Sequence, residues 1–280
     1  NKSLSAQIQN GIVGNPNPAQ SEIFLGGLQT AKTFSQEVQL TSNRPDSPLQ
    51  WIVGLFYYHD KTQIQTDVYG TCVGTVCANI PQLIPSQTTG RQTTKSYSGY
   101  AEGTYSITPS TRITLGLRYT SDEKSLAGTL VPLAGRPNSI PAFPPSVITS
   151  PDGVIDTDVT FGKLTWKAVL AQDITPDIHG YVSYNRGFKS GGYNPISFSN
   201  PPSRPEVLDS YEVGVKSELF DRMLRLNVSA FYYDYKDIQL RSTAPPAPPG
   251  GSLLFNAASA HIKGIDGDFL FAPVRSLTIN

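Results

Sequence analysis

The sequence lacks long apolar runs, carries no net charge and has few histidines, and each shortage excludes a class of protein. No segment approaches the roughly 18 consecutive apolar residues of a membrane-spanning helix. The 22 basic residues balance the 22 acidic ones, so we expect no nucleic acid partner. His59, His179 and His261 lie far apart in the chain. We therefore predict no metal site, no cofactor and no catalytic centre, and the protein is not expected to be an enzyme.

The chain is instead rich in segments that alternate apolar and polar residues, with 14 tyrosines and 12 phenylalanines. Residues 209–239 hold two such runs on either side of a short turn at 220–223. Alternation with a period of two indicates β-strands, so this segment is predicted to be an antiparallel hairpin. A tilted strand needs about 9–11 residues to cross a bilayer, and each run is long enough.

The connections between the predicted strands alternate between short and long. We predict ten strands, at 33–43, 49–60, 97–107, 111–120, 159–173, 178–189, 209–219, 224–239, about 253–271 and after 275. The short connections are 44–48, 108–110, 175–177, 220–223 and 272–275, and the long ones are about 61–95, 125–158, 190–206 and 241–252; residues 1–32 are predicted to be a loop. Short turns at one end and long loops at the other are typical of outer-membrane barrels. The predicted fold class is all-β, an antiparallel up-and-down transmembrane β-barrel segment. Aromatic residues near strand ends suit the two interfacial girdles of such a barrel: Trp51, Tyr57, Tyr119, Tyr211 and Tyr232.

Six segments, in order, resemble strands of TonB-dependent receptors. They are 34–42 with 51–58, 115–120 with 122–124, 184–194, 211–220, 230–239, and 256–258 with 262–266. The resemblance is to the siderophore-receptor-like branch of the family. It implies that residues 1–280 are part of one barrel domain of about 22 strands with a plugged lumen. The plug domain and the closing C-terminal strands are expected to lie outside this sequence.

The resemblance also implies a function and a set of partners. Such a receptor takes up a scarce ligand, most often a ferric siderophore, across the outer membrane of a Gram-negative bacterium. Its partners are outer-membrane lipid, the small-molecule ligand and the TonB–ExbB–ExbD complex, which acts through the plug region. Two other classes stay open: a passive porin-like channel barrel, and a surface β-protein that transports nothing. Iron chelates, cobalamin, glycans and plant-derived aromatics all remain candidate ligands.

The glycine-rich segment 187–194, GFKSGGYN, is the candidate ligand-binding stretch. Arg186, Lys189, Tyr193 and Asn194 offer hydrogen-bond donors to an anionic ligand. The alternative is that the glycines shape the passage from a strand into a loop. A phosphate-binding loop is excluded, because no strand–loop–helix setting surrounds the segment.

Two further groups of residues have open interpretations. Cys72 and Cys77 lie in a predicted extracellular loop, where an oxidising environment favours a disulfide between them. The inward-facing cations are expected either to form a basic lumen wall or to pair with Glu102, Glu212, Glu218 or the plug. These cations are Arg112, Arg118, Lys163, Lys167, Lys216 and Arg225.

Overall fold

The computed structural model describes residues 5–10, 22–71, 86–132, 154–194, 199–242, 253–274 and 276–280. These residues form fifteen strands. Their bounds are β1 Ser5–Asn10, β2 Glu22–Thr41, β3 Leu49–Thr71, β4 Ser86–Thr108, β5 Thr111–Pro132, β6 Val154–Thr175, β7 Ile178–Lys189, β8 Gly192–Asn194, β9 Ser199–Ser203, β10 Glu206–Leu219, β11 Leu224–Lys236, β12 Gln239–Ser242, β13 Leu253–Asn256, β14 Ser259–Val274 and β15 Leu277–Ile279. The described part of the chain contains no helix long and apolar enough to cross a membrane.

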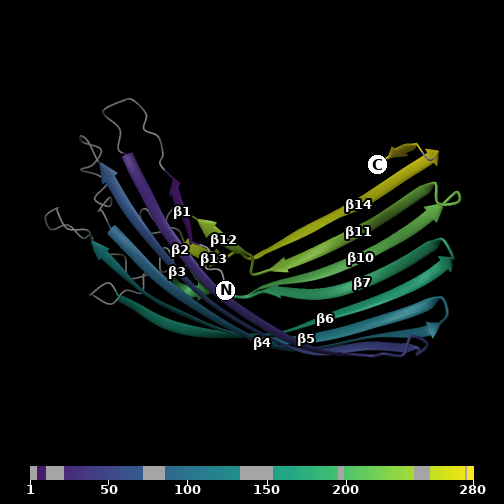
Figure 1. Cartoon of the computed structure of the whole chain (residues 1–280), viewed down its shortest axis with the longest axis horizontal. Helices are drawn as coiled ribbons and strands as arrows, with labels where there is room; N and C mark the ends of the chain where they lie inside the picture. The colour runs from purple at the N-terminus through teal and green to yellow at the C-terminus, as the bar shows by residue number, and fades with distance from the viewer. Residues whose placement is uncertain are drawn as a thin grey trace.

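Eleven of the strands form one antiparallel sheet in the order β1-β2-β3-β4-β5-β6-β7-β10-β11-β14-β15. Each strand pairs with its neighbour in this order, which follows the chain, and the sheet curves into an open trough (Figure 1). β8 with β9 and β12 with β13 form two small hairpins beside it. The predicted all-β, antiparallel up-and-down fold is confirmed. The strand predicted for 224–239 ends at Lys236, and residues 253–256 of the strand predicted for 253–271 belong to a separate small sheet as β13.

Several predicted loops are wrong in part, because strands occupy their edges. Residues 1–32 were expected to be a loop but contain β1 and the start of β2. β3 and β4 extend into the predicted loop 61–95, and β5 and β6 extend into 125–158. The predicted loop 190–206 contains β8, β9 and the first residue of β10, and the predicted loop 241–252 begins with the last two residues of β12. A break at 257–258 also divides the single strand predicted for 253–271. Polar residues on both faces of these extensions remove the apolar alternation that marks a strand.

The apolar side chains of the large sheet lie on its outside. Val38 and Leu55 are directly paired, and Leu55 is 70 % exposed. The same face carries Leu115 and Leu117, which are also exposed, while the opposite face is polar. Among the described residues, buried hydrophobic side chains are few and cluster around Leu126. An apolar outer face with a polar interior is the arrangement of a transmembrane barrel.

An aromatic belt crosses this outward face part-way along β2–β6 and closer to the long-connection ends of β7, β10 and β11. Tyr184 of β7 stacks on Tyr211 of β10, with ring centroids 4.8 Å apart. Over β2–β4, the Tyr57 ring lies 6.2 Å from Phe34 and 5.2 Å from Tyr97. We call the following residues the outer girdle: Phe34, Tyr57, Tyr97, Tyr119, Trp166, Tyr184, Tyr211 and Tyr232. Of the five aromatic residues predicted for the girdles, Trp51 alone lies at the opposite end, next to a short turn.

The turn between β10 and β11 holds three non-glycine residues at positive φ. They are Phe220 at 55°, Asp221 at 53° and Arg222 at 67°. The Met223 N–H donates to the carbonyl of Phe220 at 3.1 Å, so Asp221 and Arg222 are the central pair of a tight turn. Positive φ at both central residues is a feature of the turns that match the twist of a hairpin. The left-handed region costs residues other than glycine about 1–2 kcal/mol.

We expect Arg222→Gly to stabilise the barrel, because glycine adopts positive φ without that cost. The free energy of unfolding in urea should rise by about 1 kcal/mol. Asp177→Gly is the matched control, since Asp177 occupies another short turn without positive φ. The control should lower stability slightly. Equal effects of the two substitutions would contradict strain at Arg222.

Candidate ligand-binding surface in the lumen

The inward face of the sheet is lined by polar side chains that bind one another. The Tyr100 ring lies over Gly54, its direct cross-strand partner, where a Cβ would meet the ring at 2.5 Å. The Tyr100 hydroxyl thereby reaches β2 and donates to the Glu37 carboxylate at 2.7 Å. Tyr181 lies over Gly214 in the same way and donates to Glu212. Each tyrosine ring therefore packs against a glycine of the neighbouring strand, and its hydroxyl donates a hydrogen bond to a glutamate of the wall.

Most of the inward cations predicted from the sequence are bound within the wall. Lys167 pairs with Glu102 at 2.7 Å, and Arg225 pairs with Glu218 at 3.1 Å. Arg118 lies over the rings of Phe56 and Tyr100, and Lys216 lies over that of Tyr181. The alternative of pairing with glutamates of neighbouring strands therefore holds for Lys167 and Arg225, whereas Arg118 and Lys216 contact aromatic rings.

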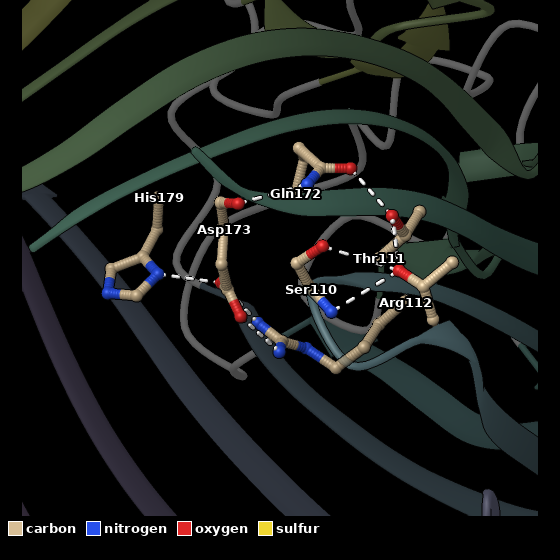
Figure 2. Close-up of polar contacts among 7 residues, drawn as sticks. Ser110, Thr111, Arg112, Gln172, Asp173 and His179 are labelled. Carbon is tan, nitrogen blue, oxygen red and sulfur yellow. Dashed lines mark hydrogen bonds and ion pairs between the residues drawn. The ribbon is translucent and has the colours of Figure 1, made fainter. Parts of the chain in front are cut away.

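Arg112 belongs to a cluster at the short-turn end of the wall. Both of its terminal nitrogens donate to the Asp173 carboxylate, at 2.7 and 2.8 Å. His179 Nδ1 lies 2.7 Å from the same carboxylate, so Asp173 is approached from β5 and β7 together (Figure 2). The nearby Thr111 hydroxyl donates to Gln172. The cluster links three consecutive strands. Within the described part of the chain, no group of three His, Cys, Asp or Glu residues is placed to hold a metal ion.

The β8–β9 hairpin folds over the inward face of β5 and β6, toward the end of the long connections. Tyr193 is 6 % exposed and packs with Leu126 and Ile155. Its hydroxyl lies 3.2 Å from that of Thr157. Asn194 beside it is 2 % exposed. Within the described residues, the hydrophobic core consists of Leu126, Ile155 and Tyr193, and it fixes the hairpin against β5 and β6.

Two lysines border this hairpin. The ammonium group of Lys124 lies 3.4 Å from where a Cβ on Gly192 would be. Lys124 is half-buried, and the charges of Asp122 and Lys189 act on it. Lys189 at the end of β7 is exposed. Within the described residues, neither lysine lies within 4.0 Å of a carboxylate. The sequence did not point to Lys124 because the predicted strand ended at residue 120. In the structure β5 continues, and Lys124 lies on the same inward face as Arg112 and Arg118.

Gly191 connects β7 to this hairpin in a place with no room for a side chain. A Cβ there would lie less than 3.0 Å from the Ser203 carbonyl oxygen and from the Phe161 ring. The Gly192 N–H donates to the Ser203 hydroxyl at 3.2 Å, and that hydroxyl donates to the Gly192 carbonyl at 3.1 Å. The expectation that the glycines shape this transition therefore fits Gly191. Gly187 has open space around it.

Arg186 lies away from the other predicted ligand-binding residues, on the outward face. It is paired in register with Trp166 and Asp209, and its guanidinium lies 4.3 Å from the Trp166 ring centre. It binds both oxygens of Asp209, with Nε 2.6 Å from Oδ1. Lys189, Tyr193 and Asn194 lie on the inward side. Residues 186–194 therefore contribute side chains to both the outward and the inward face of the barrel wall.

Comparison with known proteins identifies the family of this barrel. A family model described as "TonB dependent receptor-like, beta-barrel" matches residues 5–278. The chain belongs to the TonB-dependent receptor family. Proteins of this family are outer-membrane transporters and receptors of Gram-negative bacteria rather than enzymes.

The relatives of this receptor barrel include proteins with several ligands. It is 27 % identical to the pesticin receptor of Yersinia enterocolitica over 210 residues, which are 72 % of this chain and 28 % of that protein. It is 30 % identical to the vitamin B12 transporter BtuB of Vibrio vulnificus over 134 residues, which are 46 % of this chain and 21 % of that protein. The chain therefore spans less than a third of the length of these curated relatives.

Solved structures share the fold of this receptor barrel. The ferric yersiniabactin uptake receptor FyuA of Yersinia pestis matches with a TM-score of 0.69 and 17 % identity, over 90 % of this chain and 34 % of that one. The siderophore receptor PiuA of Acinetobacter baumannii matches with a TM-score of 0.64 and 18 % identity, over 91 % and 38 %. Cys72 and Cys77 lie outside the described residues, so their disulfide stays a prediction.

Proposed function

We propose that the complete receptor takes up a ferric siderophore, and that the β8–β9 hairpin contributes to ligand capture at the extracellular end of the lumen. Family membership supports energised uptake across the outer membrane. Two structural relatives are described as receptors for siderophores or their ferric complexes. In this proposal the TonB–ExbB–ExbD complex acts through the plug region, as the family resemblance implies.

The observation that carries the ligand assignment is the pair Lys124 and Lys189. Within the described residues neither ammonium group lies within 4.0 Å of a carboxylate, although the charge of Asp122 acts on Lys124. Lys167 and Arg225, lower in the lumen, are instead paired with glutamates of the wall. An anionic chelate would supply the acceptor oxygens that these ammonium groups lack. Tyr193 and Asn194 belong to the same surface, with the tyrosine hydroxyl bonded to Thr157. Arg186 is left out of the proposed contact set, because it faces outward and is held by Asp209.

Uptake of iron by intact cells tests this function. Iron-limited cells carrying the complete gene should accumulate ⁵⁵Fe from a ferric siderophore when TonB is present and lose that uptake when it is deleted. Uptake that does not depend on TonB would favour a passive channel. Cobalamin uptake without iron uptake would keep the transporter and replace the ligand.

The lysine pair has a separate readout. Lys124→Gln with Lys189→Gln should raise the concentration for half-maximal uptake at least about tenfold, because each lysine loses a charge-assisted hydrogen bond. Lys263→Gln, an exposed lysine on β14, is the control and should leave uptake unchanged. Unaltered uptake in the double variant would remove the lysines from the site while leaving the receptor's function intact.

A further inference from the structure

Two side-chain amides of the β12–β13 hairpin lie at the junction with the β8–β9 hairpin. Gln239 of β12 and Asn256 of β13 are direct partners in the register of their own small sheet. β13 lies against both β8 and β9. Both amide side chains are half-buried. We call Gln239 and Asn256 the amide clamp.

The amide clamp binds main-chain atoms on both sides of the β8–β9 hairpin. The Gln239 side-chain nitrogen donates to the carbonyl of Ser190, which precedes β8, and to the carbonyl of Arg204, which follows β9, each at 2.9 Å. The Asn256 side-chain nitrogen donates to the same Arg204 carbonyl at 2.9 Å, and its oxygen accepts the Arg204 N–H at 2.7 Å. Ser190 and Arg204 lie outside the strands, so these amides serve main-chain groups at the neck of the hairpin, where neither strand continues.

The clamp is itself fixed to the large sheet. Two main-chain hydrogen bonds join 237–238 to 257–258, where the chain leaves β11 for β12 and returns from β13 to β14. The Gln239 N–H donates to the carboxylate of Glu206, at the start of β10, at 2.9 Å. Because β10, β11 and β14 are adjacent in the large sheet, these bonds hold the clamp to the barrel wall.

The β8–β9 hairpin needs such support from outside. Its strands have three and five residues, and their register pairs only Gly192 with Ser203 and Asn194 with Ser199, with an irregularity between the two pairs. A two-stranded hairpin alone is marginally stable in water. Packing of Tyr193 anchors β8 along its length, and the amide clamp anchors both strands at the neck.

We propose that Gln239 and Asn256 are positioning residues for ligand capture, an inference that rests on the proposed role of β8–β9 in that capture. They hold the neck of the hairpin in place and do not contact the ligand. The apparent dissociation constant of a ligand equals the intrinsic constant divided by the fraction of receptor in the binding-competent arrangement. A clamp that keeps this fraction near one therefore raises the affinity by organising the free receptor.

Hydrogen–deuterium exchange of the complete receptor without ligand tests whether the clamp holds the hairpin. Gln239→Met with Asn256→Leu keeps the approximate size of both side chains and removes their hydrogen-bonding groups. Exchange in peptides that cover β8 and β9 should become at least about tenfold faster, because local opening no longer breaks the bonds to the neck. The urea midpoint of the barrel should stay unchanged, since its strands pair elsewhere.

Asn227→Leu is the matched control for these measurements. The Asn227 side-chain nitrogen donates to both carboxylate oxygens of Asp268, at 3.3 and 3.0 Å, between β11 and β14 of the wall. This variant also loses two amide hydrogen bonds, but at a site away from the hairpins. Its exchange in β8 and β9 should match that of the wild type.

Equilibrium binding of ferric yersiniabactin to the complete receptor gives the second measurement. The double clamp variant should bind about tenfold more weakly than the wild type, and Asn227→Leu should bind equally well. Faster exchange in the hairpin together with weaker binding supports the positioning role.

Three other outcomes have distinct meanings. Unchanged exchange in the double variant would overturn the proposal whether or not a ligand binds, and weaker binding in that case would make the amides ligand contacts. Faster exchange with unchanged affinity would overturn it as well, because the position of the hairpin would then not matter for capture. A wild-type receptor that takes up no ferric siderophore would contradict the proposed function, while the exchange result would still decide whether the clamp holds the hairpin.

Discussion

Replacing Asp209 by asparagine is expected to destabilise the barrel by about 3–5 kcal/mol, since it leaves a buried ion pair with one partner. The Asp209 side chain is 3 % exposed and accepts hydrogen bonds from Arg186 and from the Tyr184 hydroxyl, the latter at 3.1 Å. Lys236 contributes a third contact. Asparagine keeps the size of the side chain but removes the charge that holds Arg186 and Lys236 on the outward face. The measurement is the free energy of unfolding of the complete receptor in urea.

Two further variants make this result specific. Glu218→Gln breaks the exposed pairs with Arg225 and Arg222 and should cost less than about 1 kcal/mol, as surface pairs do. Asp209→Asn combined with Arg186→Met removes both charges of the pair and should recover part of the lost stability. If the single Asp209 variant unfolds at the wild-type urea concentration, the pair does not stabilise this face.

The second large effect concerns ligand capture rather than folding. Gly191→Ala is expected to reduce the affinity for the transported ligand by more than about tenfold, because displacing the hairpin removes at least one hydrogen bond to a charged ligand, worth about 1.5–3 kcal/mol. An alanine Cβ would overlap the Ser203 carbonyl oxygen, so β8 and β9 must separate. Tyr193 and Asn194 move with β8. The barrel itself pairs through other strands and should keep its stability.

Gly187 supplies the matched control within the same segment. It has no atom within 4 Å of the position of an added Cβ and no positive φ. Gly187→Ala should therefore bind ligand as the wild type does, measured by equilibrium binding to whole cells. Equal losses in both variants would indicate that the segment needs flexibility, and no loss in either would exclude the hairpin from the binding surface.

The fold was predictable from sequence where one face of a strand contacts lipid and the other contacts polar groups. In β5, Leu115, Leu117 and Tyr119 alternate with polar residues, and the structure has them exposed on the outward face. The strand ends beyond the girdle were not predictable in this way. Residues such as Thr62 and Gln63 meet polar surroundings on both faces, so no apolar period marks the strand.

The candidate site was less predictable, because aromatic residues occupy both faces of β7. Tyr181 lies in the lumen and Tyr184 lies in the outer girdle, so the pattern did not show on which face Arg186 lies. The register against Asp209 decides it, and that register is a long-range property. The inward fold of β8 and β9 likewise depends on contacts with Leu126 and Ile155, which are distant in the chain.

The continuation of paired strands beyond the girdle has a consequence for how such a receptor diversifies. β3 and β4 remain in register as far as Val68 opposite Ser86, so the two chain ends of the connection between them are held one strand spacing apart. The entropy of closing a loop between fixed ends grows slowly, by about 0.6 kcal/mol for each doubling of its length. Insertions and deletions in that connection should therefore cost little stability. New cell-surface specificities can arise there without any change in the barrel beneath.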